Sequence, residues 1–264
     1  MERIISLAAG VLPEFPPEQL VLSAAAAGFN AAGIWYDAAS WSDQRTRDVA
    51  AALHDSNLIA LDIEAAWFHP GEAISTHDAI VDIAGAIGAR NILCVSSEPN
   101  VADTQRRFEH LCRRAEGSDI RIALEFLALT SIKTLQQALD VVSAVDHPAG
   151  AILIDALHLQ RNGYTPADID GINPRLLPYL QLCDATAELK DSSMDGLLED
   201  ALYLRRMPGA GELPLAELLK AFNKDTPISL EIRSRALMEQ YPDATLRAKA
   251  VYAGASQYFC RTGD

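Results

Sequence analysis

Short apolar runs alternate with longer amphipathic stretches along the whole chain of 264 residues. The runs that predict strands are 3–8, 32–36, 58–64, 91–95, 121–126, 150–155, 179–183 and 228–232. Each is followed by residues with helical periodicity or by a long polar connection. Runs such as Ala151-Ile152-Leu153-Ile154 show no polar alternation, which is typical of parallel strands covered on both faces. The repeated order therefore predicts one parallel sheet.

The number of units favours a closed (β/α)8 barrel, the TIM barrel, over an open doubly wound sheet. An open sheet usually carries a glycine-rich phosphate loop after its first strand. Here that turn reads Ala8-Ala9-Gly10-Val11-Leu12-Pro13, with neither GxGxxG nor a Walker pattern. No Pro/Ser-rich linker interrupts the rhythm. We therefore expect a single TIM-barrel domain over residues 1–264.

The net charge of -14 limits the classes of partner. Affinity for phosphate backbones and for anionic membranes comes mainly from Lys and Arg, so we expect neither nucleic acid nor membrane as a partner. The N-terminus does not resemble a signal peptide, and no apolar run is long enough to span a bilayer. The four cysteines form no CxxC pair, which indicates reduced thiols. These features predict a cytoplasmic protein with a small-molecule substrate, and a homo-oligomer is compatible with them.

Oxygen-bearing side chains occur at the carboxyl ends of four predicted strands, where barrel enzymes carry their chemistry. They are Glu125, Asp155, Gln181 and Glu231. A carboxylate in an apolar strand is costly unless it is paired, protonated or bound to a metal. Such donors suit Mg²⁺ or Mn²⁺, with Co²⁺ or Zn²⁺ also compatible, and the ion would relieve the repulsion between the carboxylates. The four residues therefore predict one divalent metal site. The alternative is ion-pair scaffolding with Arg121, Arg233 or Arg235.

Two residues outside these strands are predicted to reach the same mouth. His158 lies three residues beyond Asp155, which makes it a substrate contact or general base, with a capping or solvent histidine as the alternative. Arg205 follows a long acidic loop over 184–205 and precedes a glycine-containing turn. It is expected to contact an anionic or hydroxylated substrate, with simple surface charge as the alternative.

The third strand offers two further substrate contacts. Glu64 closes that strand, where a substrate-facing carboxylate competes with a buried ion pair. Trp67 follows it, as a wall of the pocket or as ordinary loop packing. Trp35 has the same ambiguity after the second strand.

Several short motifs stand in order on strands five to eight. They are Ala123-Leu124-Glu125, Asp155-Ala156-Leu157-His158, Leu180-Gln181-Leu182-Cys183-Asp184 and Ser229-Leu230-Glu231, with Arg205 and Pro208-Gly209-Ala210-Gly211-Glu212 as a fifth. In these motifs the chain resembles the sugar phosphate isomerase/epimerase family, the xylose-isomerase-like barrels. The resemblance implies that Glu125, Asp155 and Glu231 bind a divalent metal. It also implies that His158 contacts substrate and that Arg205 lies near it.

The chain departs from this pattern at two positions. Gln181 stands where sugar epimerases carry His, and in this it resembles the bacterial 3-dehydroshikimate dehydratases of the same superfamily. Ala210 replaces the glutamate of the common Pro-Gly-Glu-Gly form. The superfamily also contains endonuclease IV-type repair enzymes, but the few histidines and the acidic balance of this chain argue against that activity.

The first functional expectation is an isomerase or epimerase acting on a small polyhydroxylated carbonyl compound, a sugar or sugar-like molecule. Proton transfer would pass through a metal-stabilised enediolate, with Glu125 and Glu231 as the two bases. The second is a metal-dependent dehydratase, a lyase resembling 3-dehydroshikimate dehydratase, in which the enolate expels hydroxide and His158 is the acid or base. The third is a non-catalytic sugar-binding barrel.

Overall fold

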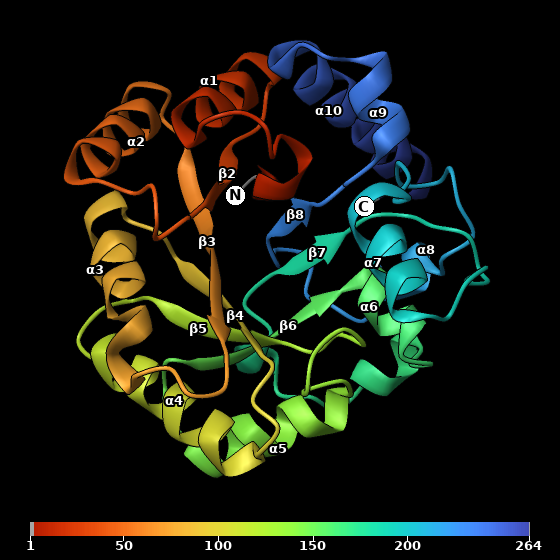
Figure 1. Cartoon of the computed structure of the whole chain (residues 1–264). Helices are drawn as coiled ribbons and strands as arrows, with labels where there is room; N and C mark the ends of the chain where they lie inside the picture. Colours follow the sequence, from red (N-terminus) through yellow and green to blue (C-terminus); the bar gives the residue numbers. More distant parts are fainter. Residues whose placement is uncertain (1–2, 264) are drawn as a thin grey trace.

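Eight parallel strands close into a barrel in chain order, so the prediction of a TIM barrel is confirmed (Figure 1). The computed structural model describes residues 3–263. The strands are β1 (Ile5–Leu7), β2 (Ala31–Trp35), β3 (Ile59–Phe68), β4 (Asn91–Ser96), β5 (Arg121–Glu125), β6 (Gly150–Asp155), β7 (Leu180–Leu182) and β8 (Ile228–Leu230). β1 pairs with both β2 and β8, which closes the ring.

Helices surround the barrel and connect successive strands (Figure 1). They are α1 (Pro17–Ala27), α2 (Asp43–Asp55), α3 (Asp78–Ile87), α4 (Val101–Arg114), α5 (Leu135–Val145), α6 (Ala156–Arg161), α7 (Met194–Tyr203), α8 (Leu215–Lys220), α9 (Arg235–Gln240) and α10 (Ala244–Thr262). Short 3-10 turns are η1 (Ala9–Val11), η2 (Ile74–His77), η3 (Pro166–Ile169) and η4 (Pro174–Leu176). No helix within residues 3–263 is both long and apolar enough to cross a membrane.

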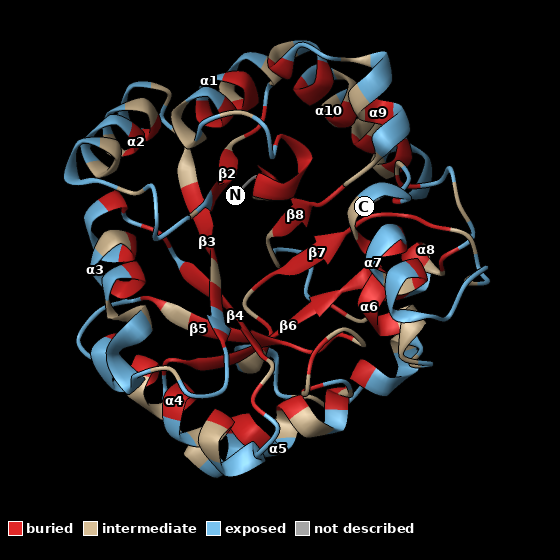
Figure 2. Cartoon of the chain, viewed as in Figure 1, coloured by how far each residue is buried: buried red, intermediate tan, exposed pale blue. Residues whose placement is uncertain are grey.

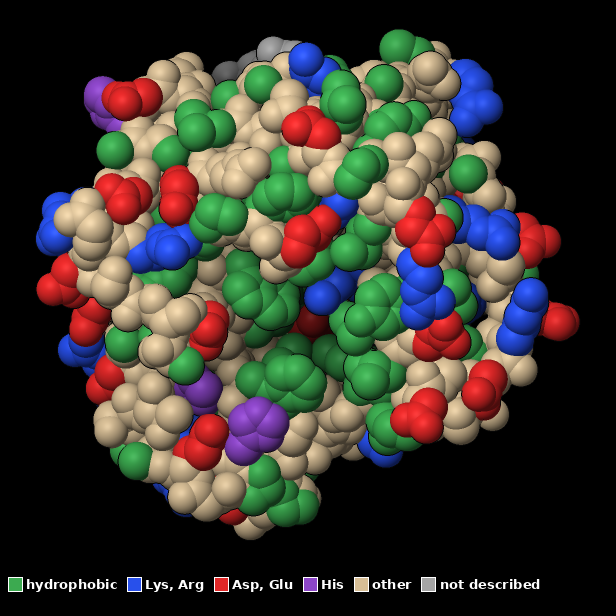
Figure 3. Space-filling model, turned by 45° about the horizontal axis from the view of Figure 1, so that its top comes forward, with side chains coloured by type: hydrophobic (Ala, Val, Ile, Leu, Met, Phe, Trp, Pro, Cys, Tyr) green, Lys and Arg blue, Asp and Glu red, His purple; other side chains and the backbone are tan. Residues whose placement is uncertain are grey.

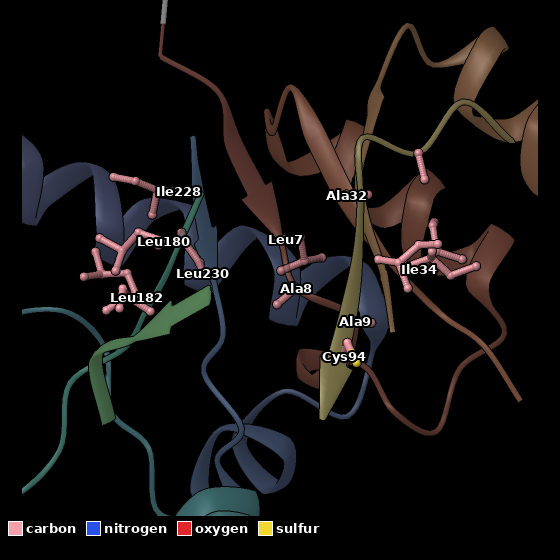
Figure 4. Packing of buried hydrophobic residues seen from close by; sticks show 14 of the residues in the cluster. Leu7, Ala8, Ala9, Ala32, Ile34, Cys94, Leu180, Leu182, Ile228 and Leu230 are labelled. Atoms are coloured by element: carbon pink, nitrogen blue, oxygen red, sulfur yellow. The ribbon is translucent and has the colours of Figure 1, made fainter. Parts of the chain in front are cut away.

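Alternating side chains of the strands supply two separate apolar layers. The larger layer lies between strands and helices, and Figure 4 shows Leu180, Leu182, Ile228 and Leu230 gathered where β7 and β8 lie side by side. The smaller layer fills the barrel interior and includes Leu153. The strands and the inward faces of the helices are buried, whereas the outer helix faces are exposed (Figure 2). Strands buried on both sides explain the uninterrupted apolar runs of the sequence.

Three local features differ from the sequence prediction. β3 does not end at Glu64 but continues to Phe68, and its pairing shifts register against both β2 and β4. The stretch 184–205, predicted as a loop, contains α7. It was missed because the stretch around α7 is rich in Asp, Glu and Ser, and α7 itself exposes much of its surface. α6 begins directly after Asp155, whose side chain caps it, and it is too short for its periodicity to be visible.

Arg247 of α10 joins the last helix to the turn after β1. Its buried guanidinium donates to the carbonyl oxygens of Tyr241 at 2.9 Å and Val11 at 3.2 Å, and to the Glu14 carboxylate at 2.6 Å. These bonds connect the last βα unit to the first, because Val11 and Glu14 lie in the turn that follows β1. A buried guanidinium is retained at low cost only when its donors are used in this way.

Replacing Arg247 with Met should lower the free energy of unfolding by about 2–4 kcal/mol, because buried carbonyl oxygens lose a charged donor. Lys249→Met on the exposed face of the same helix is the matched control and should change it by less than about 0.5 kcal/mol. Urea unfolding followed by circular dichroism measures both. Equal stabilities of the two variants would contradict the role given to Arg247.

Candidate functional site

Three carboxylates and an amide converge at the carboxyl ends of β5 to β8. Glu125 and Asp155 are the last residues of β5 and β6, and Glu231 directly follows β8. Gln181 of β7 is in register with Asp155, and none of the four is more than 6% exposed. The parallel register and the alternation of side chains place all four toward the barrel axis. The four predicted metal ligands thus lie at the same end of the barrel.

Arg205 lies among these carboxylates. Its Nη1 is 2.6 Å from Asp155 Oδ2 and 3.2 Å from Glu231 Oε2, and its Nε donates to the carbonyl oxygen of Ala201 at 2.9 Å. The side chain is 3% exposed, so the alternative of a surface charge is wrong. Because Ala201 belongs to α7, this guanidinium connects the carboxylates to the helix that follows β7.

Two of the three arginines named in the ion-pair alternative do not pair with the carboxylates, whereas the charge of the third, Arg233, opposes the rise in the pKa of Glu231. Arg121 donates to backbone oxygens near the amino end of β6, including Gly150 O at 2.7 Å. Arg235 pairs with exposed Glu199 at 3.1 Å. Neither reaches Glu125, Asp155 or Glu231. Sequence spacing could not find Arg205 as the partner, since it lies 50 residues from Asp155.

His158 lies beside this group on α6, as predicted. Its Nε2 is 4.0 Å from Glu125 Oε1 and 3.4 Å from Arg205 Nη2, and it is 8% exposed, so it is not a solvent histidine. The backbone N–H groups of Leu157 and His158 donate to Asp155 Oδ1 at 2.7 and 3.0 Å. Asp155 therefore caps α6, and this cap brings His158 over the carboxylates.

Burial and mutual repulsion govern the ionisation of the group. Burial raises the pKa of Glu231 to about 8, although the charge of Arg205 opposes the shift. Burial, with the negative charge of Asp155, raises the pKa of Glu125 well above its usual range. Burial would also raise the pKa of Asp155, but Arg205 outweighs it and holds that pKa at about 2. Burial lowers the pKa of His158 to about 4. The positive charge of Arg205 thus compensates only part of the negative charge that these carboxyl groups can carry.

The donor set fits a divalent cation. Glu125, Asp155 and His158 each offer a ligand atom, and these atoms lie within 4.8 Å of one another. Both polar atoms of the buried Gln181 amide lack a hydrogen-bond partner among residues 3–263. If the carboxylates of Glu125, Asp155 and Glu231 are all ionised, the guanidinium of Arg205 neutralises one of their three negative charges. One M²⁺ would balance the other two. Each carboxylate oxygen has two lone pairs, so Asp155 and Glu231 have acceptor capacity beyond Arg205.

A cavity of about 310 Å³ opens above these carboxylates. Six of its sixteen lining residues are charged or titratable: Glu64, Glu125, His158, Arg205, Glu231 and Arg233. The other ten are apolar and include Trp67 and residues of α7. Figure 3 shows a hollow with acidic and basic side chains inside it and hydrophobic side chains around it. Asp155 and Gln181 do not line the cavity.

β3 supplies more of this cavity than a regular strand would. Its pairing with β4 shifts between Ile63 and Ala66, so that Glu64 and Ala65 both line the cavity, together with Trp67. Trp67 therefore belongs to a strand and not to a loop, and its indole N–H donates to Ser97 Oγ at 2.8 Å. Irregular pairing of this kind often lies beside active sites, because it redirects side chains.

The glycine-containing turn after Arg205 is firmly attached to the end of β7. Asp184 Oδ2 accepts from the N–H groups of Gly209 and Gly211, each at 2.9 Å, and Oδ1 accepts from Leu213 at 3.0 Å. A Cβ on Gly211 would lie 2.3 Å from Ala185 O, so only glycine fits there. The turn that follows Arg205 is thus fixed to the end of β7.

Sequence reasoning did not assign three features of the site. Trp35, left ambiguous, lines the cavity as the last residue of β2. Arg233, considered only as an ion-pair partner, lines it too. Asp62 is fully buried, and burial together with the negative charge of Glu231 raises its pKa to about 7. The alternation Leu61-Asp62-Ile63-Glu64 was a visible signal for Asp62, but nothing local indicated Arg233.

A closed parallel barrel with an oxygen-rich cluster at the carboxyl ends of its strands defines an α/β barrel with a candidate metal site. The chain belongs to the xylose isomerase-like TIM barrel family, whose pattern matches residues 21–253. A 3-dehydroshikimate dehydratase of Pseudomonas putida (strain KT2440) is 31% identical over 136 residues, which are 50% of this chain and 20% of that protein. The chain thus spans a fifth of the length of this curated relative.

Two solved structures share the fold. A xylose isomerase-like TIM barrel/4-hydroxyphenylpyruvate dioxygenase fusion protein has a TM-score of 0.80 at 22% identity, over 100% of this chain and 44% of that one. A D-allulose 3-epimerase from Methylomonas sp. has a TM-score of 0.70 at 16% identity, over 97% of each chain. At these identities the likeness shows the fold alone. The proteins similar to this chain thus include an epimerase, by fold, and a dehydratase, by partial sequence identity.

Arg205→Met should lower the free energy of unfolding by about 3–5 kcal/mol, because Asp155 and Glu231 would be left buried without their counter-charge. The adjacent and exposed Arg206 offers a matched control, since within residues 3–263 its side chain donates only a 3.4 Å hydrogen bond to Ala210 O. Arg206→Met should change stability by less than about 0.5 kcal/mol. Urea unfolding in the presence of a chelator compares them. If Arg205→Met were as stable as Arg206→Met, the carboxylates would not depend on this guanidinium.

Proposed function

We propose that this chain is a metal-dependent lyase that dehydrates a small hydroxylated carbonyl compound. The observation that carries the proposal is the unequal environment of the two cavity-lining carboxylates. Glu231 is held by Arg205 at 3.2 Å, whereas the ion-pair contact of Glu125 is His158 at 4.0 Å. Glu125 is thus positioned as a base, and the titratable side chain of His158 lies beside it. Elimination requires such a pair.

The metal would be held by Glu125, Asp155, Gln181 and Glu231, with His158 close enough to join them. Mg²⁺ or Mn²⁺ suits this predominantly oxygen-based set. When bound, such an ion polarises a carbonyl and lowers the pKa of the neighbouring C–H.

The side chains of the cavity then divide the work. Glu125 takes the proton from the carbon beside the carbonyl, the C–O bond at the next carbon breaks, and the proton leaves with that oxygen as water. His158 can relay this proton because it lies between Glu125 and Arg205. Arg205 keeps Asp155 ionised and in place. Glu64 and Trp67 line the remaining part of the substrate's path.

An isomerase or epimerase is the second candidate, because Glu125 and Glu231 both line the same cavity. One would remove the proton and the other would return it to a different carbon or face. This candidate requires Glu231 to release Arg205 during turnover. The 31% identity to a dehydratase, together with Gln181, supports the lyase over it.

Removal of one ligand should reduce metal affinity by at least about tenfold, since even outer partners of a ligand matter on that scale. We expect one divalent ion per wild-type chain by elemental analysis after dialysis. Glu125→Gln and Glu231→Gln should lose it, and Glu239→Gln, on exposed α9, should keep it. A metal content unchanged in both cavity variants would refute the ligand assignment.

The reaction is tested in D₂O with 3-dehydroshikimate and D-allulose as first substrates. A lyase gives a conjugated product with new ultraviolet absorbance, and Glu125→Gln should abolish it. Deuterium in recovered isomer without that absorbance would replace the lyase with the epimerase. If tight binding of a substrate occurred with neither change, the chain would be a binding barrel for that compound.

A further inference from the structure

Arg233 carries a positive charge into the cavity that the proposed reaction does not use. It lies two residues after Glu231, lines the cavity and is half-buried. Its guanidinium carbon is 5.5 Å from the centre of the Trp35 ring. Within residues 3–263 its guanidinium donates no hydrogen bond and forms no ion pair. Its five N–H donors are therefore available to a ligand.

The path of this side chain is set by the turn after β1. A Cβ on Gly10 would lie 2.8 Å from Arg233 Cδ, so the stem crosses the turn where a side chain is absent. Arg205 differs, because its donors are already engaged by Asp155, Glu231 and Ala201. Of the two arginines of the cavity, only Arg233 has hydrogen-bond donors without a partner among residues 3–263, although its charge opposes the rise in the pKa values of Glu64 and Glu231.

The walls of the cavity are unsuited to a molecule covered with hydroxyl groups. Ten of the sixteen lining residues are apolar, among them Trp35, Trp67, Leu127 and Leu202, and none of the rest is a hydroxyl or amide side chain. A polyol placed against such walls would lose hydrogen bonds to water without replacement. An apolar face of a ligand would instead gain from its burial there.

We infer that the substrate carries a carboxylate bound by Arg233 and an apolar face packed against the Trp35 and Trp67 side of the cavity. This inference rests on the proposed function, since it specifies the substrate of the same site. The hydroxylated carbonyl end then points to the carboxylates below. Arg233 is thus a specificity-determining residue.

A carboxylate fits better than a phosphate ester. Arg233 is a single positive charge, and Glu64 and Glu231 line the same cavity. A phosphate dianion would bring a second negative charge toward them without a second free cation. A planar carboxylate also matches the two-pronged geometry of a guanidinium.

The experiment measures binding by isothermal titration of the full chain, as purified, with four probes that share a six-membered ring. These are cyclohexanecarboxylate, the neutral cyclohexanecarboxamide, cyclohexyl phosphate and myo-inositol. The carboxylate should bind about tenfold more tightly than the amide, the scale of one charged hydrogen-bonding pair. It should also bind more tightly than the phosphate and the polyol.

Arg233→Gln should reduce this preference for the carboxylate over the amide to about twofold or less, and Arg233→Lys should restore part of it. Arg235→Gln, two residues further and outside the cavity, is the matched control and should leave it unchanged. Circular dichroism checks that each variant is folded.

Equal binding of carboxylate and amide by the wild type, or no binding of the carboxylate, would overturn the inference. So would a preference that survives in Arg233→Gln, because the anion would then bind elsewhere, such as at a metal. If myo-inositol bound more tightly than the carboxylate, the inference of an apolar ligand face would be wrong. If cyclohexyl phosphate bound more tightly, the inference that the substrate carries a carboxylate would be wrong. None of these readings needs turnover, so failure here is distinct from failure of the proposed reaction.

Discussion

The buried guanidinium of Arg205 is the interaction on which the candidate site depends. Asp155 and Glu231 come from different strands and would repel one another in an apolar interior. Arg205 contacts both, at 2.6 and 3.2 Å, and its Nε holds the carbonyl oxygen of Ala201 in α7. One positive charge therefore sets the ionisation of the floor and the position of a helix that forms part of the wall. A third carboxylate, Glu125, remains less compensated, which leaves it suited to chemistry.

The cavity owes its contents to irregularity in β3 as much as to the regular barrel. Both register shifts occur in this strand, and they leave Asp62 buried in the interior and Glu64 and Ala65 in the cavity. Trp67, further along the same strand, forms part of the cavity wall. A regular strand alternates strictly and would place fewer of these side chains inside. β3 thus contributes both an acidic side chain and part of the apolar wall, which supports a substrate with one polar end and one apolar face.

Much of the architecture was predictable from short-range pattern. Strands buried on both faces read as apolar runs, and α1 begins at Pro17 and ends before Gly28, as its terminal residues predict. Glu125, Asp155 and Glu231 were found because a carboxylate inside such a run needs an explanation. α7 escaped notice because its packing on the barrel, and not its composition, stabilises it. Arg233 was considered only as an ion-pair partner because a free guanidinium is indistinguishable from a paired one until its neighbours are known.

The linear order of residues was sufficient to specify a closed parallel barrel and the ends of the strands that carry oxygen donors, since periodicity records which faces are buried. It did not specify which cation meets which anion. Arg205 and Asp155 are 50 residues apart, and their contact exists only because β6 and the segment after α7 reach the same end of a closed ring. The shape and polarity of the cavity arise in the same way, from side chains of many strands and of the helices α6 and α7, which barrel closure brings together.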